Sequence, residues 1–243
     1  MDYQLTFKPY GARAILIEWP PVIDEGVLYD VLGFKEKIRK ESIKGLLDVN
    51  HAYNSLLVVY NDFLLNFKDE IEVLKTVYEK GQDILKSTYR LWRIPVCYDT
   101  RFGIDLEALS VSKSLSIDTI IKLHSQPIYT VYFIGFLPGF LYLGGLDEVL
   151  HTPRKATPRL KIEKGAVAIG GNQTGVYPDE SPGGWNIIGN SPIDFFDIKE
   201  ETPCFAAPGD QIQFHPVSLK EYQDIKTLVE AGVYQIESEV IDD

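Results

Sequence analysis

Two copies of one tripeptide stand five residues apart, Thr152-Pro153-Arg154 and Thr157-Pro158-Arg159, inside a segment dense in glycine. Eleven of the nineteen glycines lie between Gly135 and Gly189, and five of the fourteen prolines are interspersed with them. Glycine permits positive φ and a close approach of the backbone to a neighbour, whereas proline fixes φ. This segment therefore favours turns with particular backbone shapes over long regular elements, and we expect a binding surface here.

The composition is that of a globular chain. With 243 residues, 45% of them hydrophobic, the chain can form one large domain or two small ones. No run approaches the ~18 apolar residues of a membrane span, and the N-terminus lacks the basic and apolar regions of a signal peptide. The two cysteines and four histidines show neither disulfide nor metal-ligand spacing. We expect a cytoplasmic protein with no membrane segment and no metal site.

Charge is distributed unevenly along the chain. The net charge of −11 argues against a nucleic-acid partner, which would require a basic surface. Residues 152–164 nevertheless contain five lysines and arginines and one glutamate. Such a basic island can attract a small anion or an acidic partner surface to one place. The alternative is a solvated loop with scattered charges.

The first third of the chain has the pattern of a small α/β unit. Apolar spacing predicts helices at 26–39 and 66–85 and strands at 4–7, 14–19, 43–49 and 55–60. Helices and strands in this order favour a sheet covered by helices. We place a boundary near 81–88 and predict an N-terminal α/β sandwich domain of residues 1–87.

Short strands and turns predominate in residues 88–243, the second predicted domain. Strands are expected at 92–96, 128–136, 166–169, 186–188, 193–196 and 211–214. Residues 128–136 are apolar on both faces, which is typical of a buried central strand. Ser116 and Ser218 are expected to cap two helices, which end before Pro127 and at Gly232. The many short strands indicate a closed β-architecture, so the fold class is α+β.

Several common catalytic and nucleotide-binding motifs are missing. The chain has no GxxxxGK[ST] loop, no GxGxxG, no GxSxG and no HExxH. Met1 is the only methionine, which excludes the usual Met-Lys-Met context of biotin attachment. Any ATP used by this protein must bind at an unconventional site or on another chain.

The polar residues between the predicted strands form a candidate site. The Arg154 and Arg159 guanidinium groups can bind a carboxylate, and the Gln173 side chain can bind an amide. The backbone N–H groups of Gly183 and Gly184 can stabilise an oxyanion. The remaining candidates are Thr174, Tyr177, Ser181 and Trp185. The alternative is that the glycines serve turns and that the aromatic residues Phe136, Phe140, Tyr142 and Trp185 are core.

His124 is a candidate general base with an equally simple structural explanation. It continues the apolar face of the helix that begins after Ser116, together with Ile117, Ile120 and Ile121. A buried, hydrogen-bonded histidine is the more ordinary outcome at such a position.

Four glycine-rich blocks, taken in order, resemble one known family. They are GFLPGFLYLGGL from Gly135, TPRKATPR from Thr152, QTGVYP from Gln173 and SPGGWNIIG from Ser181. The sequence is similar to the family that contains the B subunit of 5-oxoprolinase, the KipI-type histidine-kinase inhibitors and allophanate hydrolase subunit 1. The resemblance extends to IPVCYD at 94–99 and, more loosely, to SLLVVY at 55–60.

The resemblance implies both a fold and partners. It implies a small N-terminal α/β domain followed by a cyclophilin-like β-barrel domain. It also implies two partners of 5-oxoprolinase, the C subunit or KipA-type protein and the A subunit, which together with this chain would open 5-oxoproline to L-glutamate with consumption of ATP. In that case the substrate is a small carboxylate, His124, Gln173 and Thr174 are catalytic candidates, and the isolated chain can be inactive.

Two other functions fit the same resemblance. The chain can be a KipI-type protein that binds and inhibits a sensor histidine kinase, or part of a carboxyltransferase that acts on allophanate or other urea derivatives. The sequence alone does not separate them, because a groove that binds a ligand can also bind a loop of another protein.

Overall fold

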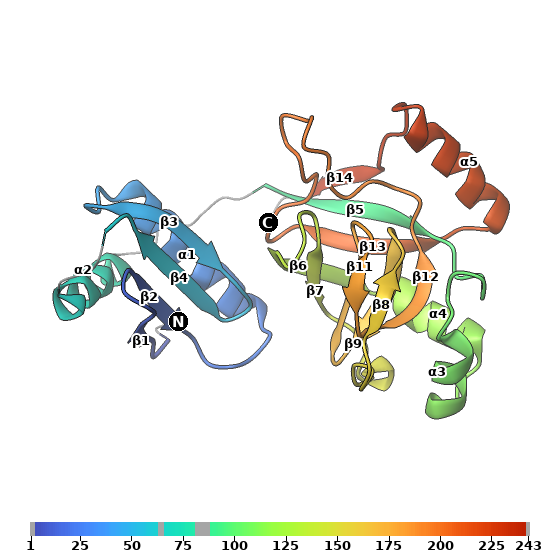
Figure 1. Ribbon diagram of the computed structural model, residues 1–243, viewed down its shortest axis with the longest axis horizontal. Helices are drawn as coiled ribbons and strands as arrows, with labels where there is room; N and C mark the ends of the chain where they lie inside the picture. Colours follow the sequence, from blue (N-terminus) through green and yellow to red (C-terminus); the bar gives the residue numbers. More distant parts are fainter. Residues whose placement is uncertain (1–2, 63–65, 81–87, 242–243) are drawn as a thin grey trace. The chain divides into compact units, whose positions relative to one another are not determined.

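The computed structural model describes residues 3–62, 66–80 and 88–241 (Figure 1). The chain divides into two compact units, residues 1–87 and 88–243, each with its own hydrophobic core.

The first unit is an antiparallel four-stranded sheet with two helices (Figure 1). The strand order is β1-β2-β4-β3. The elements are β1 (Thr6–Pro9), β2 (Ala14–Glu18), α1 (Glu25–Lys40), β3 (Leu46–His51), β4 (Ser55–Tyr60) and α2 (Phe67–Glu79). Helix α1 begins where the Asp24 side chain accepts a hydrogen bond from the Val27 N–H, and it packs on β3 and β4. The strands predicted at 14–19 and 55–60 and the helix at 26–39 are confirmed.

The core of this unit follows from alternation in the strands. Ile15, Ile17 and Val58 point to the face that α1 covers, where Val31 and Phe34 meet them. Helix α2 ends at Glu79, earlier than the expected residue 85, and residues 81–85 of that prediction lie outside the described residues.

The second unit is built on an eight-stranded sheet of order β12-β9-β10-β7-β6-β13-β5-β14. All neighbours are antiparallel except β13 and β5. The strands are β5 (Tyr89–Val96), β6 (Ile128–Ile134), β7 (Leu141–Gly144), β9 (Ala166–Gly170), β10 (Gln173–Val176), β12 (Asn186–Asn190), β13 (Gln211–Pro216) and β14 (Ser238–Ile241). The central position and burial expected of β6 are confirmed.

The expected closed barrel is not formed by the described residues. Strands β12 and β14 are the two edges of the sheet, and no continuous ladder joins them. A single isolated bridge pairs Cys97, just after β5, with Asn190 at the end of β12. The sheet is thus curved far enough for its ends to touch at one point, while β14 extends it past β5 as an open edge.

Further elements complete this unit. A two-stranded ribbon consists of β8 (Arg159–Ile162) and β11 (Ser181–Gly183), and the helices are α3 (Leu106–Lys113), α4 (Ile117–Ser125) and α5 (Leu219–Glu230), the last lying beside β5 and β14 (Figure 1). A short 3-10 turn, η1, covers Glu148–Leu150. The caps predicted at Ser116 and Ser218 are confirmed, the second as a capping box with Glu221.

One predicted strand of this unit is wrong and several were missed. Residues 193–196 form no strand, because Ile193 and Phe195 are buried against the core without pairing to a neighbouring strand. The missed elements are α3 and the short strands β7, β8, β10, β11 and β14. Most of those strands contain glycine or proline, which weakens a strand pattern.

Candidate functional site

Two cavities of about 260 Å³ border the ribbon of β8 and β11. Side chains of Phe140, Tyr142, Tyr177 and Trp185 line the first, which we call the aromatic pocket. Ile104, Ile162 and Ile187 line the second, which we call the isoleucine pocket. The second Thr-Pro-Arg copy contributes to both, since Pro158 lines the aromatic pocket and Arg159 the isoleucine pocket.

The walls of the aromatic pocket are rings packed mostly edge to face. The Phe140 ring centroid lies 4.8 Å from that of Tyr142, 5.5 Å from Tyr177 and 5.6 Å from Trp185. Phe140, Tyr177 and Trp185 are buried, and with their neighbours they form a small core of their own. Mutual packing fixes these rings in place, so the pocket is rigid along these walls.

Glycines beside the rings make this packing possible. A Cβ atom added to Gly170 would lie 2.5 Å from ring atoms of Trp185, and one on Gly183 would lie 2.4 Å from the Tyr177 hydroxyl oxygen. Any other residue at these two positions would displace a ring. Part of the glycine-rich sequence therefore accommodates aromatic side chains and does not serve turns alone.

Arg154 is the charged residue of the aromatic pocket. Its guanidinium carbon lies 5.6 Å from the centroid of the Trp185 ring system, a cation–π contact. Within residues 3–62, 66–80 and 88–241, no carboxylate forms an ion pair with it. Burial raises the pKa of Tyr142 and of Tyr177, and the Arg154 charge opposes this only in part. Both tyrosines therefore stay neutral near pH 7.

Arg159 is bound to a buried carboxylate. Its Nη2 donates to Asp105 Oδ1 at 2.7 Å, and Lys155 Nζ lies 2.8 Å from the same oxygen. The other oxygen of Asp105 accepts the Ile187 N–H at 2.7 Å. Burial alone would raise the pKa of Asp105, but these hydrogen bonds outweigh it and lower the pKa. Although Asp105 stands at the N-cap of α3, its carboxylate holds the ribbon and does not cap the helix.

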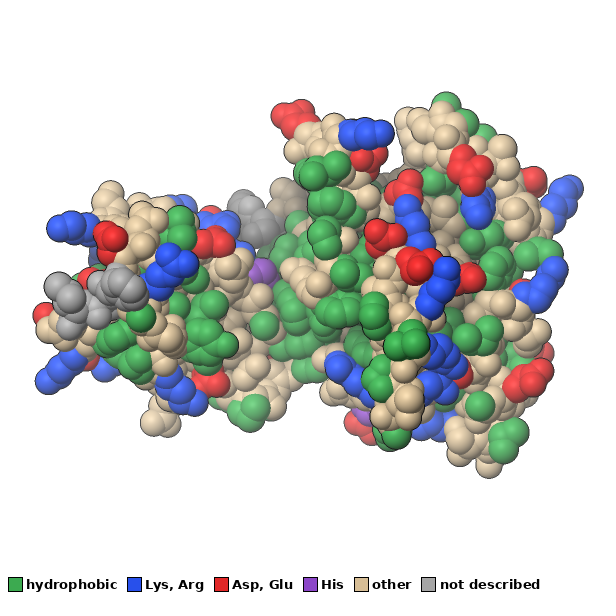
Figure 2. Space-filling model, viewed as in Figure 1, with side chains coloured by type: hydrophobic (Ala, Val, Ile, Leu, Met, Phe, Trp, Pro, Cys, Tyr) green, Lys and Arg blue, Asp and Glu red, His purple; other side chains and the backbone are tan. Residues whose placement is uncertain are grey.

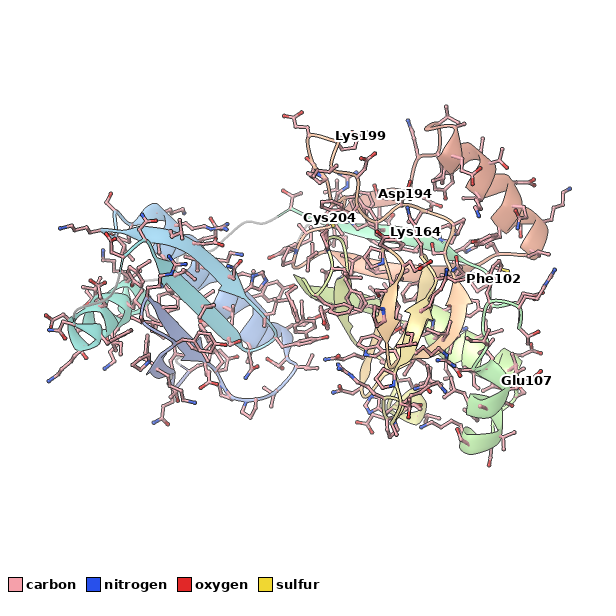
Figure 3. All side chains as sticks on the ribbon, in the orientation of Figure 1. Phe102, Glu107, Lys164, Asp194, Lys199 and Cys204 are labelled. Carbon is pink, nitrogen blue, oxygen red and sulfur yellow. The ribbon has the colours of Figure 1, made fainter. Side chains whose placement is uncertain are left out.

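The other lysines of the expected basic island are also paired. Lys161 pairs with Glu180 at 2.6 Å, and Lys164 pairs with Asp194 at 2.5 Å (Figure 3). Acidic and basic side chains are intermixed over this face of the second unit (Figure 2). The pairing acids, Asp105, Glu180 and Asp194, all lie outside residues 152–164, so the island predicted from the sequence is largely neutralised in the fold.

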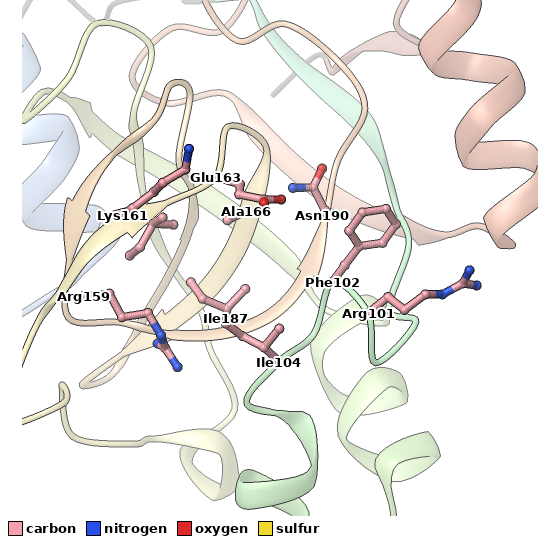
Figure 4. A pocket seen from close by; sticks show the side chains of 10 residues that line it. Arg101, Phe102, Ile104, Arg159, Lys161, Glu163, Ala166, Ile187 and Asn190 are labelled. Carbon is pink, nitrogen blue, oxygen red and sulfur yellow. The ribbon is translucent and has the colours of Figure 1, made fainter.

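The three cationic side chains of the isoleucine pocket are already bonded to acids. The ends of Arg101, Arg159 and Lys161 point outward in different directions, with Ile104 and Ile187 between them (Figure 4). Arg101 forms a two-pronged pair with the carboxylate of Asp99. The side chain of Asn190, also at this pocket, bonds to the Lys164 carbonyl and the Tyr222 hydroxyl. A charged ligand here would have to replace existing bonds.

His124 lies in the core, and the lining of neither pocket includes it. Thr174 Oγ1 donates to the Ala168 carbonyl at 3.0 Å, so it accepts from His124 Nε2 at 2.7 Å. His124 Nδ1 then accepts from the Tyr98 hydroxyl at 2.7 Å. Burial lowers the pKa of His124 to about 3. The imidazole is therefore neutral, with both nitrogens in use.

The structure thus brings together only part of the predicted site. Five of the predicted residues line the aromatic pocket: Arg154, Tyr177, Gly183, Gly184 and Trp185. Arg159 lines the other cavity, while Thr174 and His124 are buried in the core. Gln173 begins β10, and the Ser181 hydroxyl in β11 is buried without a hydrogen-bond partner among the described residues.

Sequence reasoning missed the aromatic residues that complete the pocket. Phe136, Phe140 and Tyr142 also line it; the core alternative is confirmed for Phe140, which is buried, whereas Phe136 is exposed. The sequence feature that could have indicated them is the clustering of aromatic residues beside glycines in the block that begins at Gly135. Such a cluster allows rings to converge on a cavity instead of merging into one large core.

The described residues contain neither a metal-ligand cluster nor a membrane-spanning helix. No group of three or more His, Cys, Asp or Glu side chains in them could hold a metal ion. No helix in the same part of the chain is long and apolar enough to cross a membrane.

Comparison with known proteins identifies the family. The family model described as carboxyltransferase domain, subdomain C and D, matches residues 5–206. The chain belongs to this family. Among its carboxyltransferase-domain relatives, the B subunit of 5-oxoprolinase from Escherichia coli is 45% identical over 206 residues, which are 85% of this chain and 93% of the relative. The B subunit of 5-oxoprolinase from Haemophilus influenzae is 37% identical over 210 residues, 86% of this chain and 97% of the relative.

The carboxyltransferase fold also occurs within a much longer protein. The crystal structure of urea amidolyase from Kluyveromyces lactis superposes with a TM-score of 0.84 over 98% of this chain, at 18% identity. This chain covers 16% of that protein, so the likeness concerns the fold of one segment. The family inferred from the four glycine-rich blocks is confirmed.

Proposed function

We propose that this chain is the B subunit of an ATP-dependent 5-oxoprolinase, which acts with the A and C subunits to open 5-oxoproline to L-glutamate. Relatives that match nearly their whole length to this chain carry the name of that 5-oxoprolinase component. The name supports a hydrolase role inside a complex. The urea amidolyase structure, a long chain of which this fold is one segment, supports the same idea of a larger assembly.

One observation carries the assignment of the site: Arg154 lacks an acidic partner in the described chain and lies at an aromatic pocket. The proposed substrate is a five-membered cyclic amide with one carboxylate. The guanidinium binds the carboxylate with two hydrogen bonds, and the half-buried Tyr142 ring packs on the lactam. The turn at Gly183 and Gly184 positions the amide. In this arrangement Gln173, Thr174 and His124 support the strands behind the pocket.

ATP is a substrate of the proposed complex, and the residues of this chain do not fit it. The chain has no phosphate-binding loop, and four of the five cations in residues 152–164 are engaged by acids. We therefore place the nucleotide on a partner protein of the complex. Phosphorylation of the lactam oxygen by ATP would release ADP and activate the ring for attack by water, which opens it. A second water would release phosphate and leave L-glutamate, while this chain holds and orients the ring.

The test is co-expression with candidate A and C subunits, followed by an assay of 5-oxoproline-dependent ATP hydrolysis. We expect Arg154→Ala to raise KM at least tenfold without lowering Tm. Arg90→Ala is the matched control, because the Arg90 guanidinium also lies over an indole ring, that of Trp92 at 5.3 Å, outside the pocket. A complex without 5-oxoproline-dependent ATP hydrolysis would refute the proposed function. An active complex whose KM is unchanged by Arg154→Ala would refute the aromatic pocket as the substrate site.

A carboxyltransferase acting on urea derivatives is the second candidate, favoured by the shared fold with urea amidolyase. Allophanate carries a carboxylate, as 5-oxoproline does, so Arg154→Ala does not separate the two candidates. Turnover of urea or allophanate by the complex, in place of 5-oxoproline, would favour this candidate. The KipI-type inhibition of a sensor histidine kinase stays a prediction, and it requires that the chain alone lowers kinase autophosphorylation.

A further inference from the structure

Phe136 has a backbone conformation that does not suit its side chain. It follows β6 in the turn to β7 and has φ of +68°. Ser114 is the other non-glycine residue with positive φ among the described residues, and it is small and ends a helix. A bulky side chain in this region is strained, since its Cβ crowds the following carbonyl.

The packing of Phe136 does not compensate for this strain. Its side chain is 63% exposed, and its ring contact is with Phe140, edge to face at 5.7 Å. Hydrogen bonds hold the turn, from the Gly135 N–H to the Phe140 carbonyl and from the Leu137 N–H to the Gly135 carbonyl. Gly139, in the same turn, also has positive φ (+83°), whereas position 136, with φ of +68°, carries phenylalanine.

The position of the ring supplies a reason to keep it. Phe136 lines the aromatic pocket, and it is the exposed member of a set in which Phe140, Tyr177 and Trp185 are buried. The buried rings have little exposed apolar surface that a ligand could cover. The Phe136 ring gains burial only when something occupies the pocket.

We infer that Phe136 is a ligand-contact residue whose ring covers the flat body of a carboxylate bound by Arg154. This inference rests on the pocket assigned under the proposed function. It names the ligand class as a small, flat carboxylate with an apolar or amide ring. Strained backbone at such a position is retained because it aims a side chain at the ligand.

The test uses benzoate, a flat carboxylate, titrated calorimetrically into the full chain, together with thermal unfolding. We expect saturable binding that weakens at least tenfold in Phe136→Gly, while Tm stays equal or rises because glycine relieves the strain. Phe136→Leu keeps apolar bulk on the same backbone and should stay within threefold of the wild type. Ser114→Gly relieves positive φ elsewhere and should bind as the wild type does.

Three results would overturn the inference: no saturable benzoate binding by the wild type, equal binding by Phe136→Gly, or a binding loss accompanied by a lower Tm. The last would indicate a core role for the ring. If benzoate behaves as expected but the complex does not turn over 5-oxoproline, the proposed substrate is wrong and the contact role of Phe136 stands.

Discussion

The two Thr-Pro-Arg copies place chemically identical arginines in opposite circumstances. Arg159 is bound to Asp105 and lies at a cavity whose cationic side chains are all paired with acids. Arg154 lies over the Trp185 ring at an aromatic cavity and has no carboxylate partner in the described chain. Of the two, Arg154 is the arginine whose charge is not already balanced by a carboxylate of the described residues.

The difference shows that pairing, more than residue type, decides which charge can act. The carboxylate of Asp105 is 54 residues away from Arg159 in the sequence, and it reaches both Lys155 and Arg159. By binding them it fixes the ribbon that separates the two cavities. One arginine thereby supports the site that the other one serves.

Removal of Asp105 should have the largest effect on stability. Asp105→Ala leaves the partly buried Lys155 and Arg159 without their carboxylate and the Ile187 N–H without its acceptor. We expect a loss of about 3 kcal/mol in the free energy of unfolding, measured by urea denaturation. Asp194→Ala is the control, since it breaks an exposed pair with Lys164 and should cost less than about 1 kcal/mol. Equal losses would mean that Asp105 is not an anchor.

His124 is a third case beside the two arginines, a polar group whose hydrogen-bond partners all lie in the core. Because its folded pKa of about 3 lies below the ordinary 6.5, the unfolded chain binds a proton first as the pH falls. The stabilisation is complete above pH 6.5 and is lost progressively toward pH 3, by about 2 kcal/mol at pH 5. The urea midpoint of unfolding should therefore decrease more steeply in the wild type than in His124→Gln as the pH is lowered from 8 to 5. Identical slopes in the wild type and His124→Gln would contradict the assignment.

Gly170 tests the packing of the aromatic side. Gly170→Ala places a methyl group on the Trp185 ring and should destabilise the protein by about 1.5 kcal/mol. Gly184→Ala, in the same pocket, meets nothing closer than 3.5 Å and should change stability by less than about 0.5 kcal/mol. Thermal unfolding of both variants, followed by Trp fluorescence, measures the difference. A tolerated Gly170→Ala would mean that the ring can move.

Local patterns predicted much of the fold. Apolar spacing and capping residues located α1, α4 and α5, and the apolar run at 128–136 predicted the central strand β6. The ribbon could not be predicted in this way, because β8 and β11 are short and β11 contains Pro182 and Gly183. Residues 193–196 alternate like a strand, but alternation reports burial and not hydrogen-bond pairing.

The site was predictable only in part for a similar reason. The glycine-rich segment drew attention to Arg154, Tyr177 and Trp185, which line one cavity. The pairing of Arg159 with Asp105 and the convergence of Phe140 with Tyr142 depend on how distant segments meet. No local pattern contains that information.

The most direct test of the account is to compare Arg154→Ala with Arg159→Ala in the co-expressed complex, measuring KM for 5-oxoproline and Tm of the chain side by side. The account predicts that Arg154→Ala raises KM at least tenfold and leaves Tm unchanged, whereas Arg159→Ala lowers Tm and leaves KM within threefold. The opposite pattern, or the same effect from both variants, would contradict it.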